Sequence, residues 1–472
     1  MNKKIIYPIF AAALLLLRLI FNYRYELIPG INGGYYPLQV RTLLESGHLG
    51  FADMPLYFYL NAAIVKFISF FITSNIDQLI IQISKIIDTI SLPRLIVPLY
   101  LIIRNFSKKE LPLYYEAAIV VFAMLSFSPL IMTSDLQKNA FALPLMLFFI
   151  YFLMQFYRNK SKKYLIFTLV FIFLTALTHF GVFLIALLFF IISLIVFYGK
   201  KSLLPITGII LISIFMIYLF DPQRAARLFT LWHILFKKPA IFQGPLPPLD
   251  IFNYLFSYLL IALSMIYIFH NKKSTQIFTI KLLTVFSILL FILSFPLLDV
   301  EFARRFNLFL FIPQIMIILF LYDFIKQKLK SALSLILILS SAAAVFFMTA
   351  RIKPPTITQS AYQDLSHIEK YITNPQNTLI IARHGLEWWT AWKLHVKVGQ
   401  DKAVDRQTFI KYEKVFSLVQ LKGINQIHPR QKSPFHEPYF PKERTPTYLS
   451  PYFKLVALSP ENLNFVNPEK GL

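Results

Sequence analysis

Long apolar runs recur along the chain and limit the folds that it can adopt. Most are about 18–22 residues long, which matches the hydrocarbon thickness of a bilayer crossed by an α-helix. The chain is 57% hydrophobic and only 15% charged, and this is far more apolar than a soluble chain of its length. Membrane-spanning strands would be shorter and would alternate in polarity. The sequence therefore predicts an all-α polytopic membrane protein.

Short basic clusters between the apolar runs predict the topology. Cytoplasmic loops carry an excess of Lys and Arg, and placing all the clusters on that side requires the spans to come in outward–inward pairs. We expect about eleven spans in the cytoplasmic membrane, with the N-terminus in the cytoplasm and the C-terminus outside. These spans cover residues 5–21, 80–103, 111–131, 140–157, 163–178, 181–198, 203–220, 251–269, 277–297, 307–325 and 331–350.

The formal net charge of +24 does not indicate a nucleic-acid-binding protein. Such a surface would gather basic side chains on one face among aromatic residues, whereas here they are scattered through separate loops. The chain has no cysteine, which excludes disulfides, thiolate metal sites and a cysteine nucleophile. The first apolar run lacks a small-residue cleavage site, so we expect an uncleaved span.

A long polar stretch, residues 22–79, follows the first span and forms the expected first outer loop. Residues 55–72 within it are apolar and long enough to cross the membrane. A crossing there would put the basic cluster at 104–109 outside, against the charge bias. We therefore expect a juxtamembrane or re-entrant helix at 55–72. The alternative is a true span compensated by a second crossing near residues 76–90.

The composition changes after Arg351, where Pro354 and Pro355 mark a boundary. We expect a transmembrane domain over residues 1–350 and a small extracytoplasmic α/β domain over 351–472. In the second domain, residues 377–383, 396–400 and 453–458 have the apolar pattern of short strands, and 385–395 that of an amphipathic helix.

The layout resembles the GT-C superfamily of integral-membrane glycosyltransferases, of the kind that use dolichyl-phosphate-mannose or other polyprenyl-phosphate sugars. In that family a first span leads into a long outer loop with an acid, a Gly/Tyr-Tyr turn and juxtamembrane helices. The similar residues here are Gly33-Gly34-Tyr35-Tyr36, Arg41-Thr-Leu-Leu-Glu-Ser-Gly47, Pro55-Leu56-Tyr57, Asp135 in the next outer loop, and Arg304-Arg305 followed by Pro313.

The resemblance implies sugar transfer from a polyprenyl-phosphate donor to a glycan, lipid or protein acceptor at the outer face. The transition state resembles an oxocarbenium ion, so a carboxylate must activate the acceptor and cations must hold the leaving phosphate. A divalent cation could assist, although no metal-ligand motif is evident. The implied catalytic residues are Asp135, Asp53 and Glu26, the phosphate-binding residues are Arg304, Arg305 and Lys138, and the substrate-binding residues are Tyr35, Tyr36 and His179.

Each of these residues also has a structural interpretation. Asp135 could cap the following helix, Glu26 and Asp53 could be solvated loop acids, and the two arginines could contact lipid headgroups. His179 lies between two expected spans and could bond to a backbone carbonyl that is freed where the helix breaks.

One departure from the family favours a second function. Asn32 stands where the superfamily has its first-loop acid, and an amide cannot accept the proton of an attacking hydroxyl. The alternative is a non-catalytic GT-C-like protein that binds lipid-linked saccharide or scaffolds an envelope complex. A transporter is disfavoured because paired broken spans are not evident.

Overall fold

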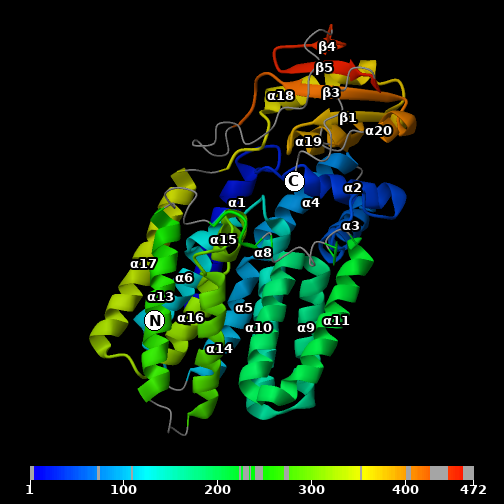
Figure 1. The fold of residues 1–472 in the computed structure, drawn as a ribbon. Helices are drawn as coiled ribbons and strands as arrows, with labels where there is room; N and C mark the ends of the chain where they lie inside the picture. The colour runs from blue at the N-terminus through cyan, green and yellow to red at the C-terminus, as the bar shows by residue number, and fades with distance from the viewer. Residues whose placement is uncertain are drawn as a thin grey trace. The chain divides into compact units, whose positions relative to one another are not determined.

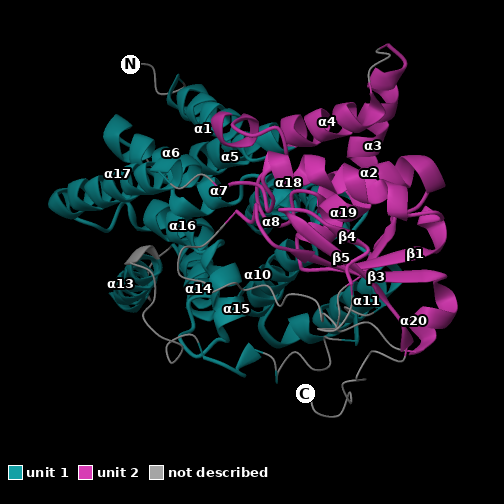
Figure 2. Cartoon of the chain, turned by 90° about the horizontal axis from the view of Figure 1, so that it is seen from above, with its two compact units in different colours: residues 1–19, 52–57, 88–351 teal, residues 20–51, 58–87, 352–472 magenta. Residues whose placement is uncertain are grey.

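The computed structural model describes residues 5–71, 75–107, 110–222, 225–226, 233, 235–239, 248–270, 276–350, 353–399, 406–425 and 445–460. Packing divides the chain into two compact units, which Figure 2 shows in different colours. Unit 1 comprises residues 1–19, 52–57 and 88–351, and unit 2 comprises residues 20–51, 58–87 and 352–472. The C-terminal segment thus folds together with two pieces of the expected first loop.

Unit 1 is built from helices, which Figure 1 labels in chain order. Its interior is apolar: every residue of α16 is buried, and Phe286 of α14 stacks against Phe189 of α10 and Phe320 of α16, with ring centroids 5.1 and 6.1 Å away. The helices are α1 (Ile6–Tyr23), α5 (Ile96–Phe106), α6 (Leu113–Leu125), α7 (Phe127–Ile131), α8 (Gln137–Asn159), α9 (Lys162–Thr178), α10 (Phe180–Tyr198), α11 (Leu203–Phe220), α13 (Pro248–His270), α14 (Ile277–Leu293), α15 (Val300–Asn307), α16 (Phe311–Leu321) and α17 (Gln327–Ala350).

Seven helical segments of the described residues are long and apolar enough to cross a membrane, or up to eight if the bent pair α15 and α16 is one span. This supports a membrane protein. One segment, residues 180–220, contains both α10 and α11. A straight helix of that length would extend about 60 Å, twice the hydrocarbon thickness, but Gly199 interrupts it with φ +58°. Eleven crossings and their orientation remain predictions.

The expected first loop contains three helices: α2 (Tyr35–Ser46), α3 (Leu56–Ser69) and α4 (Ile76–Ser91). Helix α3 has 14 residues and would extend about 21 Å, which is too short to cross a hydrocarbon core of about 30 Å. Helix α4 continues through the 3-10 helix Pro93–Leu95 into α5, and the whole apolar segment covers residues 76–106. The interpretation of residues 55–72 as a juxtamembrane helix remains a prediction.

Unit 2 contains a five-stranded mixed sheet in the order β2-β1-β3-β5-β4. Strand β1 (Thr378–Ala382) is parallel to β2 (Lys397–Gly399) and to β3 (Lys414–Gln420). Strand β5 (Phe453–Leu458) is antiparallel to β3 and to β4 (Tyr448–Leu449). Helix α19 (Leu386–Leu394) connects β1 to β2. The three predicted strands and the predicted helix are confirmed, but β3 was not predicted.

The described residues of unit 2 also form four shorter helical segments. These are α18 (Gln359–Asp364), the 3-10 helices Leu365–Tyr371 and Pro375–Asn377, and α20 (Arg406–Lys411). Thr358 caps α18, because its hydroxyl accepts a hydrogen bond from the Ala361 N–H.

Two residues of the family-like motifs have packing roles in unit 2. Arg41 of α2 is buried and donates to the carbonyl oxygens of Trp392 and Ala391 at 2.6 and 2.9 Å, at the C-terminal end of α19. A cation there neutralises the negative end of the helix dipole. A Cβ on Gly34 would lie 2.9 Å from the Trp389 ring. The Gly-Gly-Tyr-Tyr turn and Arg41 therefore join α2 to α19.

Candidate functional site

A short turn between α7 and α8, residues 132–136, lies among several buried polar side chains of unit 1. Ser134 adopts φ +68°, a left-handed conformation that is costly for a residue with a Cβ. Its N–H donates to the Asp88 carboxylate at 2.8 Å, and the Asp135 N–H donates to the Thr133 carbonyl at 2.8 Å. The buried acid thus holds the turn in its strained form.

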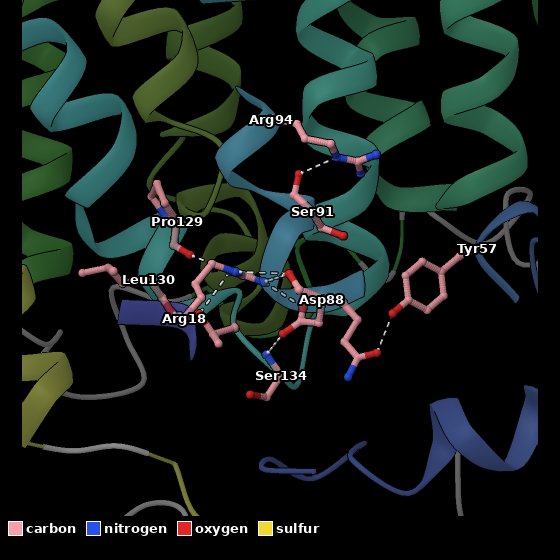
Figure 3. Close-up of polar contacts among 10 residues, drawn as sticks. Arg18, Tyr57, Asp88, Ser91, Arg94, Pro129, Leu130 and Ser134 are labelled. Atoms are coloured by element: carbon pink, nitrogen blue, oxygen red, sulfur yellow. Dashed lines mark hydrogen bonds and ion pairs between the residues drawn. The ribbon is translucent and has the colours of Figure 1, made fainter. Parts of the chain in front are cut away.

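Arg18 of α1 and Asp88 of α4 form a fully buried ion pair beside this turn, as Figure 3 shows. The Arg18 guanidinium lies 2.7 Å from Asp88 Oδ1 and also donates to the Asp88 carbonyl at 2.8 Å. A further bond of 3.1 Å reaches the Thr133 hydroxyl. Charged pairs at such positions are costly to bury and are stable only when other hydrogen bonds satisfy them.

A second buried ion pair joins the first expected outer loop to α8. Asp53 accepts from the Lys138 ammonium, and both side chains are almost completely buried. The other carboxylate oxygen of Asp53 accepts from the Met54 N–H at 2.8 Å. This contact brings together two residues for which the sequence predicted different roles, a catalytic carboxylate and a phosphate-binding cation.

The neighbouring residue on α8, Gln137, forms a third buried contact. The Tyr57 hydroxyl donates to Gln137 Oε1 at 2.6 Å, a bond that Figure 3 also draws. The amide nitrogen of Gln137 is buried and has no hydrogen-bond partner among the described residues. We refer to Arg18, Asp53, Tyr57, Asp88, Gln137, Lys138 and the 132–136 turn as the polar cluster. All of its members belong to unit 1.

The polar cluster contains three carboxylates, those of Asp53, Asp88 and Asp135. Each of the two buried ones, Asp53 and Asp88, faces a cation. A ligand anion that bound Lys138 would compete with Asp53 for the ammonium group. Asp135 is half-buried in the turn. In the chain it lies between Ser134, which bonds to Asp88, and Lys138, which pairs with Asp53.

The predicted acids do not all lie in the same unit. Asp53 and Asp135 belong to unit 1, whereas Glu26 belongs to unit 2. The Glu26 residue is exposed, and its backbone carbonyl accepts from the Lys85 ammonium at 2.8 Å. The structure thus associates Asp53 and Asp135 with the polar cluster.

The predicted phosphate-binding arginines lie on α15 and are both exposed. Arg305 pairs with Glu301 one turn earlier on the same helix. The Arg304 charge interacts with Asp250 near the start of α13. Lys138 is buried in the polar cluster, so the three predicted cations have very different surroundings.

The predicted substrate-binding residues also have identifiable contacts. Tyr35 packs edge-on against Trp388, with ring centroids 5.1 Å apart, and its hydroxyl accepts from Gln39 at 3.0 Å. Tyr36 is buried and stacks on Phe58. These two tyrosines belong to unit 2.

His179 caps a helix in unit 1. It separates α9 from α10, and its Nδ1 accepts from the Val182 N–H at 3.1 Å. This contact satisfies one of the N–H groups that a helix start leaves unpaired. The structure thus gives His179 a helix-capping contact with a backbone N–H, whereas the sequence suggested a contact with a freed carbonyl.

Sequence reasoning missed Arg18, Asp88 and Arg94. All three are charged residues inside apolar segments, at 6–23 and 76–106, and such residues are functional candidates by default. That signal is present in the sequence, but the polar residues of the loops are more conspicuous. Gln137 carried no comparable signal because its importance depends on its burial.

No three His, Cys, Asp or Glu side chains gather into a possible metal site within the part of the chain that the structure describes. The two buried acids of the polar cluster face Arg18 and Lys138. A metal ion that bound either acid would have to displace the cation that already contacts it. The divalent cation that could assist transfer therefore stays a prediction.

Neither a family model nor a curated protein matches this chain.

Proposed function

We propose that the protein is a membrane glycosyltransferase that moves a sugar from a polyprenyl-phosphate-linked donor to a glycan, lipid or protein acceptor. In this proposal the membrane is the cytoplasmic membrane, crossed about eleven times, and transfer takes place at its outer face. The supporting observation is the polar cluster, in which Asp53 contacts Lys138 next to the turn that carries Asp135. The GT-C resemblance implies a catalytic role for the two acids and phosphate binding for Lys138. Asp53 belongs to the first expected outer loop, and Asp135 and Lys138 lie at the next one.

The proposed reaction replaces one bond at the anomeric carbon of the sugar with another. The acceptor hydroxyl oxygen bonds to that carbon, and the bond from the carbon to the phosphate oxygen breaks. The hydroxyl proton goes to Asp135 or Asp53, and the polyprenyl phosphate departs with the bonding electron pair. A carboxylate positioned for this proton and a cation beside the leaving phosphate both stabilise the transition state.

A non-catalytic protein that binds lipid-linked saccharide is the second candidate. Two observations favour it: Asn32 stands at the position of the expected first-loop acid, and Lys138 neutralises Asp53. Such a protein would use the same polar cluster for binding and would not require a free base.

The two candidates are separated by replacing the proposed base. Cells that carry the gene are deleted for it and complemented with the wild-type chain or with the Asp135→Asn or Asp53→Asn variant, and the surface glycan is compared by mass spectrometry. A glycosyltransferase predicts that one or both variants leave the deletion defect uncorrected at normal expression. Correction of the defect by both variants would support the binding protein.

A further inference from the structure

We propose that Arg94 binds the phosphate group of the lipid-linked donor. This inference rests on the proposed function, which identifies the donor as a polyprenyl phosphate. Arg94 lies in the 3-10 helix Pro93–Leu95, which separates α4 from α5 inside the apolar segment 76–106. Arg94 thus lies inside a candidate span, where an ionisable residue is a functional candidate by default.

The contacts of Arg94 leave its charge without an anion. Its Nε donates to the Ser91 carbonyl at 3.1 Å, and its guanidinium lies 4.3 Å from the centroid of the Phe141 ring. Within the described residues it makes no ion pair, and it is exposed. A guanidinium in an apolar segment is costly unless an anion accompanies it.

Three other cations of unit 1 differ from Arg94 in this respect. Lys138, Arg18 and Arg305 each pair with a carboxylate. A phosphate that bound one of them would have to displace that carboxylate first. The two terminal nitrogens of Arg94 form a planar fork that matches two phosphate oxygens, and an incoming phosphate would displace no acid from it.

The position of Arg94 suits a donor whose sugar reaches the polar cluster. Tyr57 packs edge-on against the same Phe141 ring that Arg94 covers, with centroids 5.6 Å apart. Gln137 precedes Phe141 by one helical turn, about 6 Å along α8, and bonds to the Tyr57 hydroxyl. Arg94 therefore lies at the level of Phe141, about one helical turn along α8 from Gln137.

The distance along α8 between Arg94 and Gln137 allows the phosphate and the sugar of one donor to bind at different places. A phosphate at Arg94 would direct its attached sugar toward Gln137 and the Asp53–Lys138 pair. The unsatisfied amide nitrogen of Gln137 is then available to a sugar hydroxyl, since a buried donor without a partner costs about 1–3 kcal/mol. The lipid chain would remain in the hydrocarbon region, alongside the apolar residues of α5 and α8.

The experiment measures binding rather than activity. The full chain is placed in lipid nanodiscs and labelled with a polyprenyl phosphate that carries a photoreactive group at the far end of its chain. Competitors are unlabelled polyprenyl phosphate, polyprenol without phosphate, inorganic phosphate and phosphatidylglycerol. The variants are Arg94→Gln, Arg94→Lys and, as a matched exposed arginine of the same unit that also donates to a backbone carbonyl, Arg158→Gln, each checked for folding by thermal denaturation.

We expect Arg94→Gln to weaken binding at least tenfold, Arg94→Lys to weaken it less, and Arg158→Gln to leave it unchanged. Polyprenyl phosphate should compete, and polyprenol and inorganic phosphate should not. Unchanged binding by a folded Arg94→Gln variant would overturn the inference and leave the proposed function standing. Equal competition by phosphatidylglycerol would overturn it as well, since Arg94 would then contact only bulk lipid. Failure of the wild-type chain to bind polyprenyl phosphate would remove the proposed function itself.

Discussion

Replacing Asp88 by Asn tests the buried ion pair that holds the candidate site together. The substitution keeps the shape of the side chain but leaves the Arg18 guanidinium, which is fully buried, without its carboxylate. Breaking one partner of such a pair costs about 3–5 kcal/mol, or about two to three and a half powers of ten in the unfolding equilibrium. The Ser134 N–H, bonded to Asp88 at 2.8 Å, also loses its charged acceptor.

The loss is measured as a change in unfolding free energy in mixed micelles. The matched control is Glu301→Gln, which removes an ion pair of unit 1 whose side chains are about two-thirds exposed and which should cost no more than about 1 kcal/mol. In the double variant Arg18→Met with Asp88→Asn, no buried charge remains unpaired, so its cost should be clearly less than the sum of the two single changes. An Asp88→Asn cost below about 1 kcal/mol, or simple additivity in the cycle, would refute the reasoning.

Two further predictions concern the second ion pair and unit 2. Lys138→Met should destabilise the chain because it leaves the Asp53 carboxylate buried and unpaired, and adding Asp53→Asn should restore stability but not sugar transfer; a single variant as stable as wild type would contradict this. Burial raises the pKa of Tyr362 to about 12, above its ordinary value of about 10, so its contribution to stability should be complete below pH 10 and be lost toward pH 12. Tyr362→Phe should therefore flatten the alkaline loss of stability in denaturation curves, and unchanged slopes would count against the assignment.

The sequence predicted the helical segments because their cause is local. A run of apolar residues determines a helix in a membrane without reference to the rest of the chain, and α1, α8 and α17 lie close to their expected positions. In the C-terminal segment, β1 and α19 followed from short apolar patterns. Strand β3 was missed, although it pairs with both β1 and β5, because its central place depends on strands distant in sequence.

The candidate site was only partly predictable. Asp53, Asp135 and Lys138 were selected from loops, where polar residues are conspicuous. The contact between Asp53 and Lys138 spans 85 residues, and no local pattern encodes a pairing at that separation. Arg18 and Asp88 were assigned no functional role, because each lies within an apolar helical segment and only packing shows that they face each other.

The most direct test of the proposed function is the lipid content of cells that lack the gene. Polyprenyl-phosphate-linked sugars are extracted from deleted and complemented cells and quantified by mass spectrometry, together with the surface glycan. A glycosyltransferase predicts that a sugar-loaded polyprenyl phosphate accumulates in the deleted cells, and that a glycan, lipid or protein acceptor lacks the corresponding residue. Unchanged levels of every polyprenyl-phosphate sugar and an unaltered glycan would contradict the account.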